Sequence, residues 1–313
     1  LNKSLARASI TTSVISTARL LTYLVWLGTT TLWGTTWVVI RIGLRDLSPL
    51  AFAAARTTLA ALVIFLVAHF LARADRPQSH EIRFWMLIGV LQLGLPYALV
   101  FWAEQSISAG LTATLFATFP TFTVVIAHLL LDDEPMSWIK MGGAMLAFCG
   151  VAVLVGPDRG TNPPSIWPVL AVMTAAASGA FAAVIVRRHG RETSTLWLTT
   201  LQISSAALFL ILLMVLLEPQ VQVRVTPRAI WSVVYLGIVV TIGCYLGMFW
   251  LLKRMDVTLM SMSVGGEAVI GVFLGATLLG ESLGARALVG LALVVLSVVL
   301  VSLRSKLSFG PSA

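Results

Sequence analysis

Ionisable side chains inside long apolar runs are the first candidates for chemistry in this sequence. Glu267 lies in the middle of the run SVGGEAVIGVFLG, and Arg56 lies in AFAAARTTLAALV. A charged group is costly in such surroundings and is retained for a partner or a function. Glu267 could carry a proton or bind a cationic or amino group, or it could be a protonated carboxyl that only joins two helices. Arg56 could snorkel outward or pair with a carboxylate, and we interpret it as structural.

The sequence carries no catalytic or metal-binding motif around these residues. His128 is the only plausible catalytic partner for Glu267, and nothing in the spacing brings the two together. Cys149 and Cys244 stand singly and form neither a metal-ligand spacing nor a disulfide framework. Phosphate-loop, His-Glu-x-x-His and Gly-x-Ser-x-Gly motifs are absent. We therefore predict no enzyme, no cofactor and no metal, and we keep an intramembrane enzyme, a sensor or a channel as alternatives.

Aromatic side chains within the apolar runs are candidate walls of a binding cavity. They could stack on a flat or cationic substrate, although a single aromatic residue in such a run is more often there for packing. A methionine could add an adaptable apolar contact. The predicted substrate-binding residues are Trp33, Trp37, Tyr97, Phe119, Phe181, Tyr245, Met262 and Glu267.

Helix-breaking residues occur at corresponding places in two parts of the chain. Pro96 and Pro120 interrupt one pair of runs, and Gly243 and the pair Gly265-Gly266 lie at the related places. Paired breaks free backbone carbonyls, allow bending and point to a site, although Pro and Gly are also simply common in membrane helices. We predict a hinge at Pro96, Pro120, Gly265 and Gly266.

The composition explains why these residues must be positioned by membrane helices. The chain is 58% hydrophobic and 11% charged, with a mean hydropathy of +0.95. Soluble domains carry roughly 25% charged residues, so this chain could not bury its apolar surface in water. The net charge of +8 comes from basic residues in short loops, which is typical of a membrane orientation signal and excludes a nucleic-acid partner.

Ten runs are long enough to cross a bilayer, which takes about 20 apolar residues. We predict an all-α integral membrane fold, because lipid leaves backbone polar groups no partner outside a helix. The predicted spans are 20–40, 50–71, 84–103, 109–131, 137–156, 166–186, 195–217, 229–252, 257–280 and 284–303.

The stretch 97–153 reappears 148 positions later as 245–301. Eight residues match in register, and the acid Asp133 falls on Glu281. Such self-similarity indicates two related halves. Since five helices per half is an odd number, the second half must be inverted relative to the first. The matches are Gly89, Tyr97, Phe101, Trp102, Leu130, Leu131, Gly142 and Ala144 with Gly237, Tyr245, Phe249, Trp250, Leu278, Leu279, Gly290 and Ala292.

Basic residues in the loops predict the orientation. Fourteen would lie inside and six outside if the N-terminus is cytoplasmic, so we predict that both termini are cytoplasmic. Residues 1–19 could pass for a signal-peptide start, but we interpret them as an N-terminal tail, with 304–313 as a C-terminal tail. Because the chain begins with Leu1, we expect its start to be trimmed or incomplete. The six are Arg41, Arg45, Arg159, Arg224, Arg228 and Arg286.

The first span contains LWGTTWVVI at 32–40, which resembles the Leu-Trp-Gly-Ser/Thr-Asn/Thr-aromatic opening of EamA-type drug/metabolite transporters. The resemblance covers almost the whole chain and marks the family better than the substrate. Ala268 and the pair Ser178-Gly179 depart from the family pattern, where Pro and Trp-Ala are frequent. Other matches are Arg56, Pro96-Tyr97, Ala117-Thr118-Phe119-Pro120, Leu131-Asp132-Asp133-Glu134, Gly142, Gly150, Glu267 and Leu279-Gly280-Glu281.

The resemblance implies two inverted five-helix repeats, 20–156 and 166–303, around a cavity lined mainly by spans 1, 3, 4, 6, 8 and 9. It implies export of small metabolites such as amino acids, or of amphiphilic drugs. We therefore expect an alternating-access exporter in a bacterial inner membrane, with amino acids as the first guess and multidrug or cationic compounds as the alternative. Proton antiport and facilitated diffusion both stay open. The expected partners are a small-molecule substrate and the bilayer, with a monomer as the working assumption.

Overall fold

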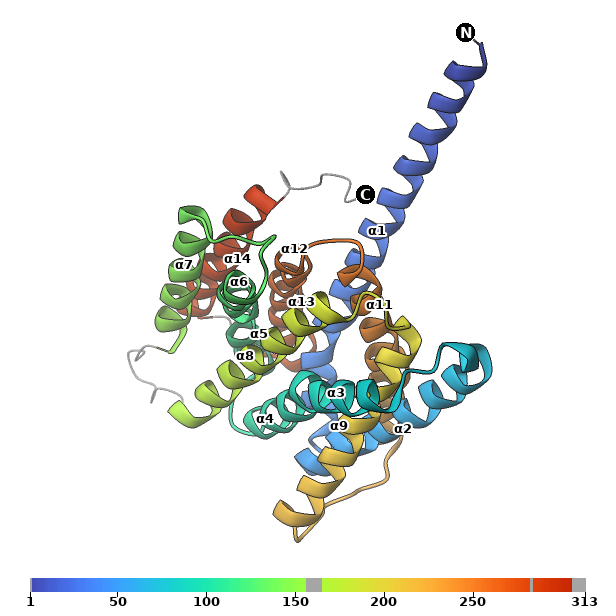
Figure 1. Cartoon of the computed structure of the whole chain (residues 1–313). Coiled ribbons are helices and arrows are strands. Elements are labelled where there is room, and N and C mark those ends of the chain that lie inside the picture. Colours follow the sequence, from blue (N-terminus) through green and yellow to red (C-terminus); the bar gives the residue numbers. More distant parts are fainter. Residues whose placement is uncertain (1, 156–164, 282–283, 306–313) are drawn as a thin grey trace.

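The computed structural model describes residues 2–155, 165–281 and 284–305. The described residues are almost entirely helical (Figure 1). Their one departure toward β-structure is an isolated bridge between Leu47 and Val223. Long apolar runs have thus folded into helices, as backbone hydrogen bonding in lipid requires.

Within the described residues, seven helical stretches are long and apolar enough to cross a membrane, which makes the chain a multi-pass membrane protein. Each measures between 22 and 26 residues. They are α2 (Pro49–Leu71), α3 with the π-helical turn η2 and α4 (Ser79–Gly89, Val90–Gly94, Leu95–Ala103), α5 with α6 (Ala109–Phe116, Phe119–Leu130), α8 (Ile166–His189), α9 (Thr195–Leu217), α10 with the π-helical turn η3 and α11 (Pro227–Val234, Tyr235–Ile242, Gly243–Leu252), and α12 with α13 (Val257–Ser261, Ser263–Leu279).

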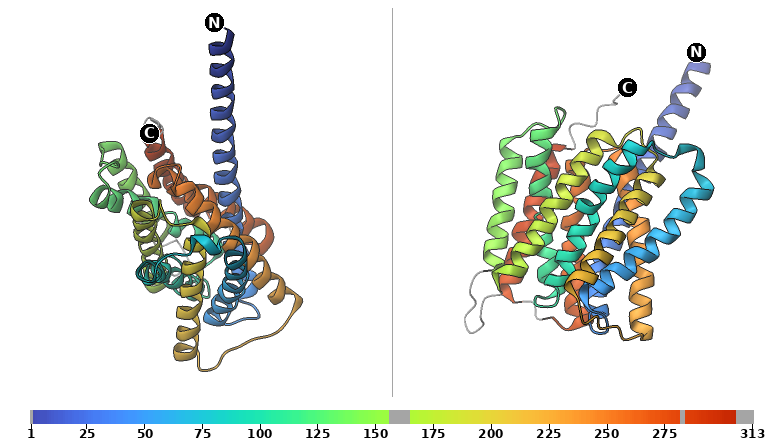
Figure 2. Two further views of the ribbon diagram at one scale, coloured as in Figure 1. Left: turned by 45° about the vertical axis from the view of Figure 1, so that its right-hand side comes forward. Right: turned by 60° about the horizontal axis from the view of Figure 1, so that its bottom comes forward.

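Three further helices accompany these spans. The first, α1 (Asn2–Gly43), contains the predicted span 20–40 and begins within the predicted tail, so that it projects well beyond the bundle (Figure 2). The other two, α7 (Trp138–Val155) and α14 (Ala285–Ser305), are shorter apolar helices. A short turn, η1 (Arg73–Asp75), follows α2.

Local sequence signals set several helix boundaries. Pro49 and Pro227 stand at the first positions of α2 and α10, where a missing N–H costs nothing. The Ser108 side chain accepts a hydrogen bond from Leu111 N at the start of α5. Gly280 ends α13 with a φ of 67°, which a residue with a side chain rarely adopts.

Helices from before and after residue 156 pack against one another. The helix α14 lies along α7 at one flank, α2 lies along α9 at the other, and α1 lies along α13 between them (Figure 1). The helix α8 contacts both α4 and α6. The two parts of the sequence are therefore interleaved and share one core.

The two ends of the bundle are named here by one residue each. The Arg187 end holds the connections 72–78, 131–137, 190–194 and 253–256. The Glu104 end holds the connections 44–48, 104–108 and 218–226, and residues 280–281 after α13. The helix α1 begins, and α14 finishes, at the Arg187 end (Figure 2).

Both π-helical turns interrupt spans at corresponding places. A shift of 148 positions carries Val90–Gly94 onto 238–242, which lies within Tyr235–Ile242. Single π-turns free a backbone carbonyl and are frequent at functional sites. Side chains donate to backbone oxygens in both turns, and Leu236 O also accepts from Thr241 Oγ1 of its own turn at 2.7 Å. Ser178 Oγ donates to Leu91 O at 2.8 Å, and Arg56 Nη2 donates to Leu236 O at 3.3 Å.

The predicted hinge residues lie near these interruptions and near two helix breaks. Pro96 follows the first π-turn, and Pro120 is the second residue of α6 after a break at Ala117-Thr118. The break between α12 and α13 falls at Met262, whereas Gly265 and Gly266 lie inside α13. A Cβ on Gly265 would lie 2.9 Å from Val298 Cγ1, so close packing requires this glycine.

Candidate functional site

An internal cavity lies between the helices at the level of the breaks. Its volume is about 80 Å³, and one water needs roughly 10–15 Å³, so it has room for a handful of waters or a small ligand. All six spans that the family resemblance names contribute. The lining residues are Trp33, Thr36, Trp37, Ile40, Gln92, Pro96, Tyr97, Val100, Phe101, Phe116, Phe119, Gly179, Tyr245, Met248, Met260, Ser263, Val264 and Glu267.

Six of the eight predicted substrate-binding residues line this cavity, and two do not. Phe181 is 38% exposed and does not line it, because a residue two positions beyond Gly179 points to the opposite side of α8. Met262 is buried but lines a separate lateral groove between α1, α13 and α14. Those that line the cavity are Trp33, Trp37, Tyr97, Phe119, Tyr245, Glu267 and the hinge residue Pro96.

Aromatic rings form two walls of the cavity. On one side Trp33 meets Tyr245 edge to face, with 5.7 Å between ring centroids. On the other, Phe116 lies 5.4 Å from Trp37 and stacks on Phe119 at 5.9 Å. These spacings are typical of favourable aromatic pairs, so the walls are preformed.

Several buried polar atoms in the lining have no hydrogen-bond partner among the described residues. They are Thr36 Oγ1, Trp37 Nε1 and Gln92 Oε1. Leaving such atoms unpaired costs about 1–3 kcal/mol each, so a ligand or water that pairs with them is favoured. Glu267, which is 3% exposed, accepts a hydrogen bond from Ser263 Oγ at 3.0 Å. The cavity thus offers donors, an acceptor and a carboxyl group.

Gln92 and Gly179 shape the side of the cavity where the chain departs from the family pattern. Gln92 Nε2 donates to Gly179 O at 3.3 Å, which leaves Gln92 Oε1 free. A Cβ on Gly179 would lie 3.1 Å from Phe119 Cε2. The sequence analysis missed Gln92, although an amide within VLQLGLP, next to Pro96, was a visible signal.

Arg56 is completely buried and does neither of the two things expected of it. Its Nη2 donates to Thr241 Oγ1 at 2.8 Å and to Tyr97 OH at 3.3 Å, and its guanidinium lies 4.5 Å above the Tyr97 ring. It neither snorkels nor forms an ion pair with any described carboxylate. Arg56 instead ties α2 to the second π-turn.

His128 has a local role. Its Nδ1 accepts a hydrogen bond from Met136 N at 3.1 Å in the connection after α6. His128 and Cys149 are exposed, whereas Cys244 is buried. Among the described residues, no group of His, Cys, Asp and Glu could hold a metal ion.

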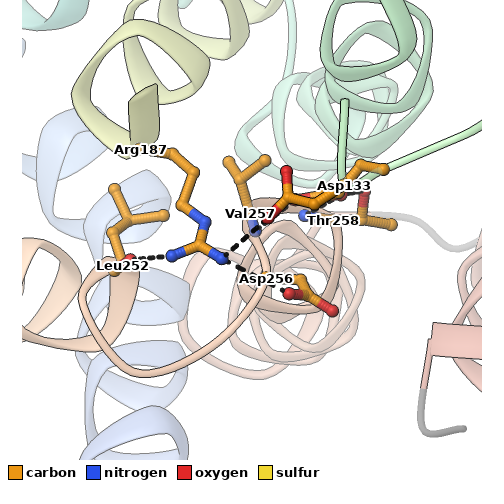
Figure 3. Close-up of polar contacts among 7 residues, drawn as sticks. Asp133, Arg187, Leu252, Asp256, Val257 and Thr258 are labelled. Carbon is orange, nitrogen blue, oxygen red and sulfur yellow. Dashed lines mark hydrogen bonds and ion pairs between the residues drawn. The ribbon is translucent and has the colours of Figure 1, made fainter. Parts of the chain in front are cut away.

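A polar cluster joins three elements at the Arg187 end of the bundle (Figure 3). Arg187, which is 9% exposed, places Nη2 3.4 Å from Asp133 Oδ2 and 3.5 Å from Asp256 Oδ1. Its Nη1 donates to Leu252 O at 3.3 Å. One side chain of α8 therefore holds the connection after α6 against the connection after α11.

Beside this cluster, Glu134 caps α12. Val257 N donates to its Oε1 at 3.0 Å, and Thr258 donates to Oε2 through both its backbone N and its hydroxyl. Burial raises the pKa of Glu134, and the hydrogen bond from Thr258 opposes that rise. A carboxylate at a helix N-terminus is favoured by the helix dipole.

The Glu104 end repeats the arrangement with the parts exchanged. Ala109 N and Gly110 N donate to Glu281 Oε1 and Oε2 at 2.8 and 3.0 Å. A shift of 148 positions carries Ala109 and Gly110 onto Val257 and Thr258. An acid from each part of the sequence thus caps the equivalent helix of the other.

Two more acids hold the Glu104 end. Glu218 accepts hydrogen bonds from Leu50 N, Ala51 N and Ser48 Oγ at 2.8–3.1 Å and so caps α2. Asp46 receives Arg228 Nε and Nη2 at 2.7 and 2.9 Å. Hydrogen bonds from Arg228 and Thr226 lower the pKa of Asp46 to about 2.

The EamA-like transporter family matches this chain twice, over residues 20–156 and 166–303. The chain belongs to this family. It is 26% identical over 279 residues to the uncharacterized inner membrane transporter YedA of Escherichia coli K12, covering 87% of each chain, and 24% identical over 248 residues to the uncharacterized transporter YoaV of Bacillus subtilis, covering 79% of this chain and 84% of that one. These names indicate a transporter rather than an enzyme.

Two further comparisons concern substrate and fold. The chain is 28% identical over 140 residues to a probable terminal-alkyne amino-acid exporter of Streptantibioticus cattleyicolor. That match covers 44% of this chain and 46% of the relative. A crystal structure at 19% identity matches with a TM-score of 0.70 and covers 92% of this chain and 99% of the other. This EamA-like chain therefore has a fold already seen in a solved structure.

Proposed function

We propose that this protein is a secondary transporter that exports small amphiphilic metabolites by alternating access, with amino acids as the first substrates to test. The observation that carries the proposal is the central cavity, which combines aromatic walls, unpaired polar atoms and Glu267. A ligand site built at the level of helix breaks is typical of transporters.

The proposal includes ten membrane spans in two inverted repeats. The π-turns at corresponding places and the exchanged caps of Glu134 and Glu281 support it, since a two-fold relation requires each contact to occur twice with the partners swapped. It also places both termini in the cytoplasm of a bacterial inner membrane, so that the Glu104 end faces outward.

Contacts between elements at both ends of the bundle support alternating access. The ion pairs of Arg187 and the cap of Glu134 would hold one end closed, and the caps of Glu281 and Glu218 would hold the other. Breaking one set while the other holds would open the cavity to one side. The hinge residues Pro96 and Pro120 lie beside the cavity, where such bending would start.

The cavity chemistry suits a molecule with an amino group and an acceptor group. Glu267 would bind the amino group, while Trp37 Nε1 and Thr36 Oγ1 would donate to a carboxylate or carbonyl. The partial similarity to an amino-acid exporter supports amino acids. Because no described lining residue is basic, cationic amphiphiles are the second candidate class.

Counterflow in proteoliposomes tests the proposal. Vesicles preloaded with an unlabelled amino acid or a quaternary amine should accumulate the same compound in labelled form, unchanged chemically, which a channel, sensor or enzyme would not do. Glu267→Gln should raise the KM for amino compounds about tenfold or more, the loss expected for a charge-assisted hydrogen bond, while leaving a neutral analogue unaffected. Absence of counterflow for every compound would contradict the proposal.

A further inference from the structure

Glu104 is a buried acid that none of the contacts above uses. It follows α4 directly, at the start of the connection to α5. Its side chain is 0% exposed, and neither carboxyl oxygen has a hydrogen-bond partner among the described residues. Burying a carboxylate without partners is far more costly than burying a neutral carboxylic acid. The site therefore favours the protonated form.

The charged groups around Glu104 come from three other elements. Arg41 of α1 donates a hydrogen bond from Nη1 to the backbone oxygen of Glu104 and not to its carboxyl group. Arg56 of α2 and Glu281, just after α13, also act on it. Burial raises the pKa of Glu104 well above its usual value; Arg41 and Arg56 oppose this rise, and Glu281 adds to it.

Glu281 is the neighbour through which Glu104 can act on the fold. The Glu281 carboxylate holds the first two amides of α5, five and six positions after Glu104. A second negative charge close to it would repel this carboxylate and so weaken the cap. A negative charge on Glu104 would therefore weaken the cap that Glu281 makes on α5.

We propose that Glu104 is a proton-binding residue of the transport cycle, which keeps the Glu104 end closed while its carboxyl group is protonated. This inference rests on the proposed alternating access. Loss of the proton to water at that end leaves two neighbouring carboxylates, which weakens the hold of Glu281 on α5 and opens the end. Uptake of a proton restores the neutral acid and the cap.

Movement of α5 would reach the cavity directly. A Cβ placed on Gly271 of α13 would lie 2.8 Å from Ala113 Cβ of α5 and 2.7 Å from Trp37 Cδ1. These three residues are thus in close contact, and Trp37 lines the cavity while Glu104 does not. Proton binding at Glu104 and substrate binding at Glu267 are therefore separate functions of two acids.

Hydrogen exchange as a function of pH tests the device without any substrate. The protection of the first turn of α5, corrected for the intrinsic rate at each pH, should be high at low pH and should fall by about tenfold for each unit of pKa difference between closed and open forms. Glu104→Gln, which mimics the neutral acid, should keep the protection high at every pH. Glu281→Gln should lower it at every pH and remove the pH dependence.

Transport provides the second arm. The transport rate of the wild type should rise as the pH is raised on the side of the membrane that the Glu104 end faces. The transport rate of Glu104→Gln should stay at the value that the wild type has at low pH. Glu192→Gln, at an exposed acid of the Arg187 end, is the matched control and should behave as the wild type. The inference would be overturned if hydrogen exchange of α5 in the wild type did not depend on pH, or if it still depended on pH in Glu104→Gln or Glu281→Gln. If hydrogen exchange depended on pH as expected but the protein transported nothing, the proposed function would be refuted instead.

Discussion

Single residues decide what the central cavity can hold. The unpaired atoms of Trp37, Thr36 and Gln92 define where a ligand can form hydrogen bonds. The aromatic walls limit how thick a ligand the cavity can hold. Gly179 sets the width, since the absence of a side chain on α8 gives Phe119 and Gln92 their positions. The departure from the family pattern at this point therefore predicts a cavity with more room on the α8 side.

Gly179→Val should narrow the cavity and discriminate against bulky substrates. A branched side chain would push Phe119, whose ring already lies 3.1 Å from the position of a Cβ, into the ligand space. We expect the KM of an aromatic substrate to rise at least about tenfold, with a much smaller rise for a small one.

Counterflow with a homologous series of substrates measures this effect. Gly142→Val is the control, because nothing lies within 4 Å of a Cβ at Gly142. An equal loss for small and large substrates would show that Gly179 does not limit the width.

Helix ends carry several specific polar contacts between elements in this fold. Apolar side chains pack many of the helix faces in similar ways, but the carboxylates of Glu134, Glu218 and Glu281 each select one N-terminus. Asp46 does the same for the connection before α10 by binding Arg228 and Thr226. The connections are therefore fixed by charge-assisted hydrogen bonds as well as by their shortness.

The contact of Asp46 should make stability depend on acid pH. The pKa of Asp46 is lowered from 3.8 to about 2, so the ionised form stabilises the folded protein above pH 3.8, and this contribution is lost as the pH falls toward 2. In detergent, the melting temperature of the wild type should fall between these values more steeply than that of Asp46→Asn. Parallel curves for the two proteins would show that this pair contributes nothing to folding.

At the scale of the whole molecule, the sequence predicted the all-helical membrane fold because apolar length and proline or glycine positions are local signals. Among the described residues, seven of the ten predicted spans correspond to helices long and apolar enough to cross a membrane. Five of the aromatic lining residues were predicted from the same runs, whereas Phe101 and Phe116 were missed and Phe181 was wrongly included. These errors arise because helical phase could not be read without the packing. Glu104, Gln92 and Arg187 were missed because their roles depend on helices distant in the chain. The repeat pointed to Asp133 and Glu281 as equivalent, but the cap that mirrors Glu281 is made by the next residue, Glu134.

The exchanged caps lead to a prediction about the entire cycle. If the two parts of the chain rock against each other, removing the Glu134 cap should favour opening of the Arg187 end, and removing the Glu281 cap should favour opening of the Glu104 end. Removing a cap destabilises the state in which that cap is formed, so the equilibrium shifts toward the other state. Glu134→Ala and Glu281→Ala should therefore shift the equilibrium in opposite directions.

Accessibility of a single cysteine in the cavity provides the measurement. With Cys149 and Cys244 replaced, a cysteine at Ser263 can be labelled by an impermeant reagent added to one side of the membrane at a time. Glu134→Ala should increase labelling from the side of the Arg187 end and decrease it from the other, and Glu281→Ala should reverse both changes. Glutamine at each position, which retains one acceptor oxygen, should produce the smaller shift. Two alanine variants that raise labelling from the same side would mean that the caps stabilise local structure and do not alternate.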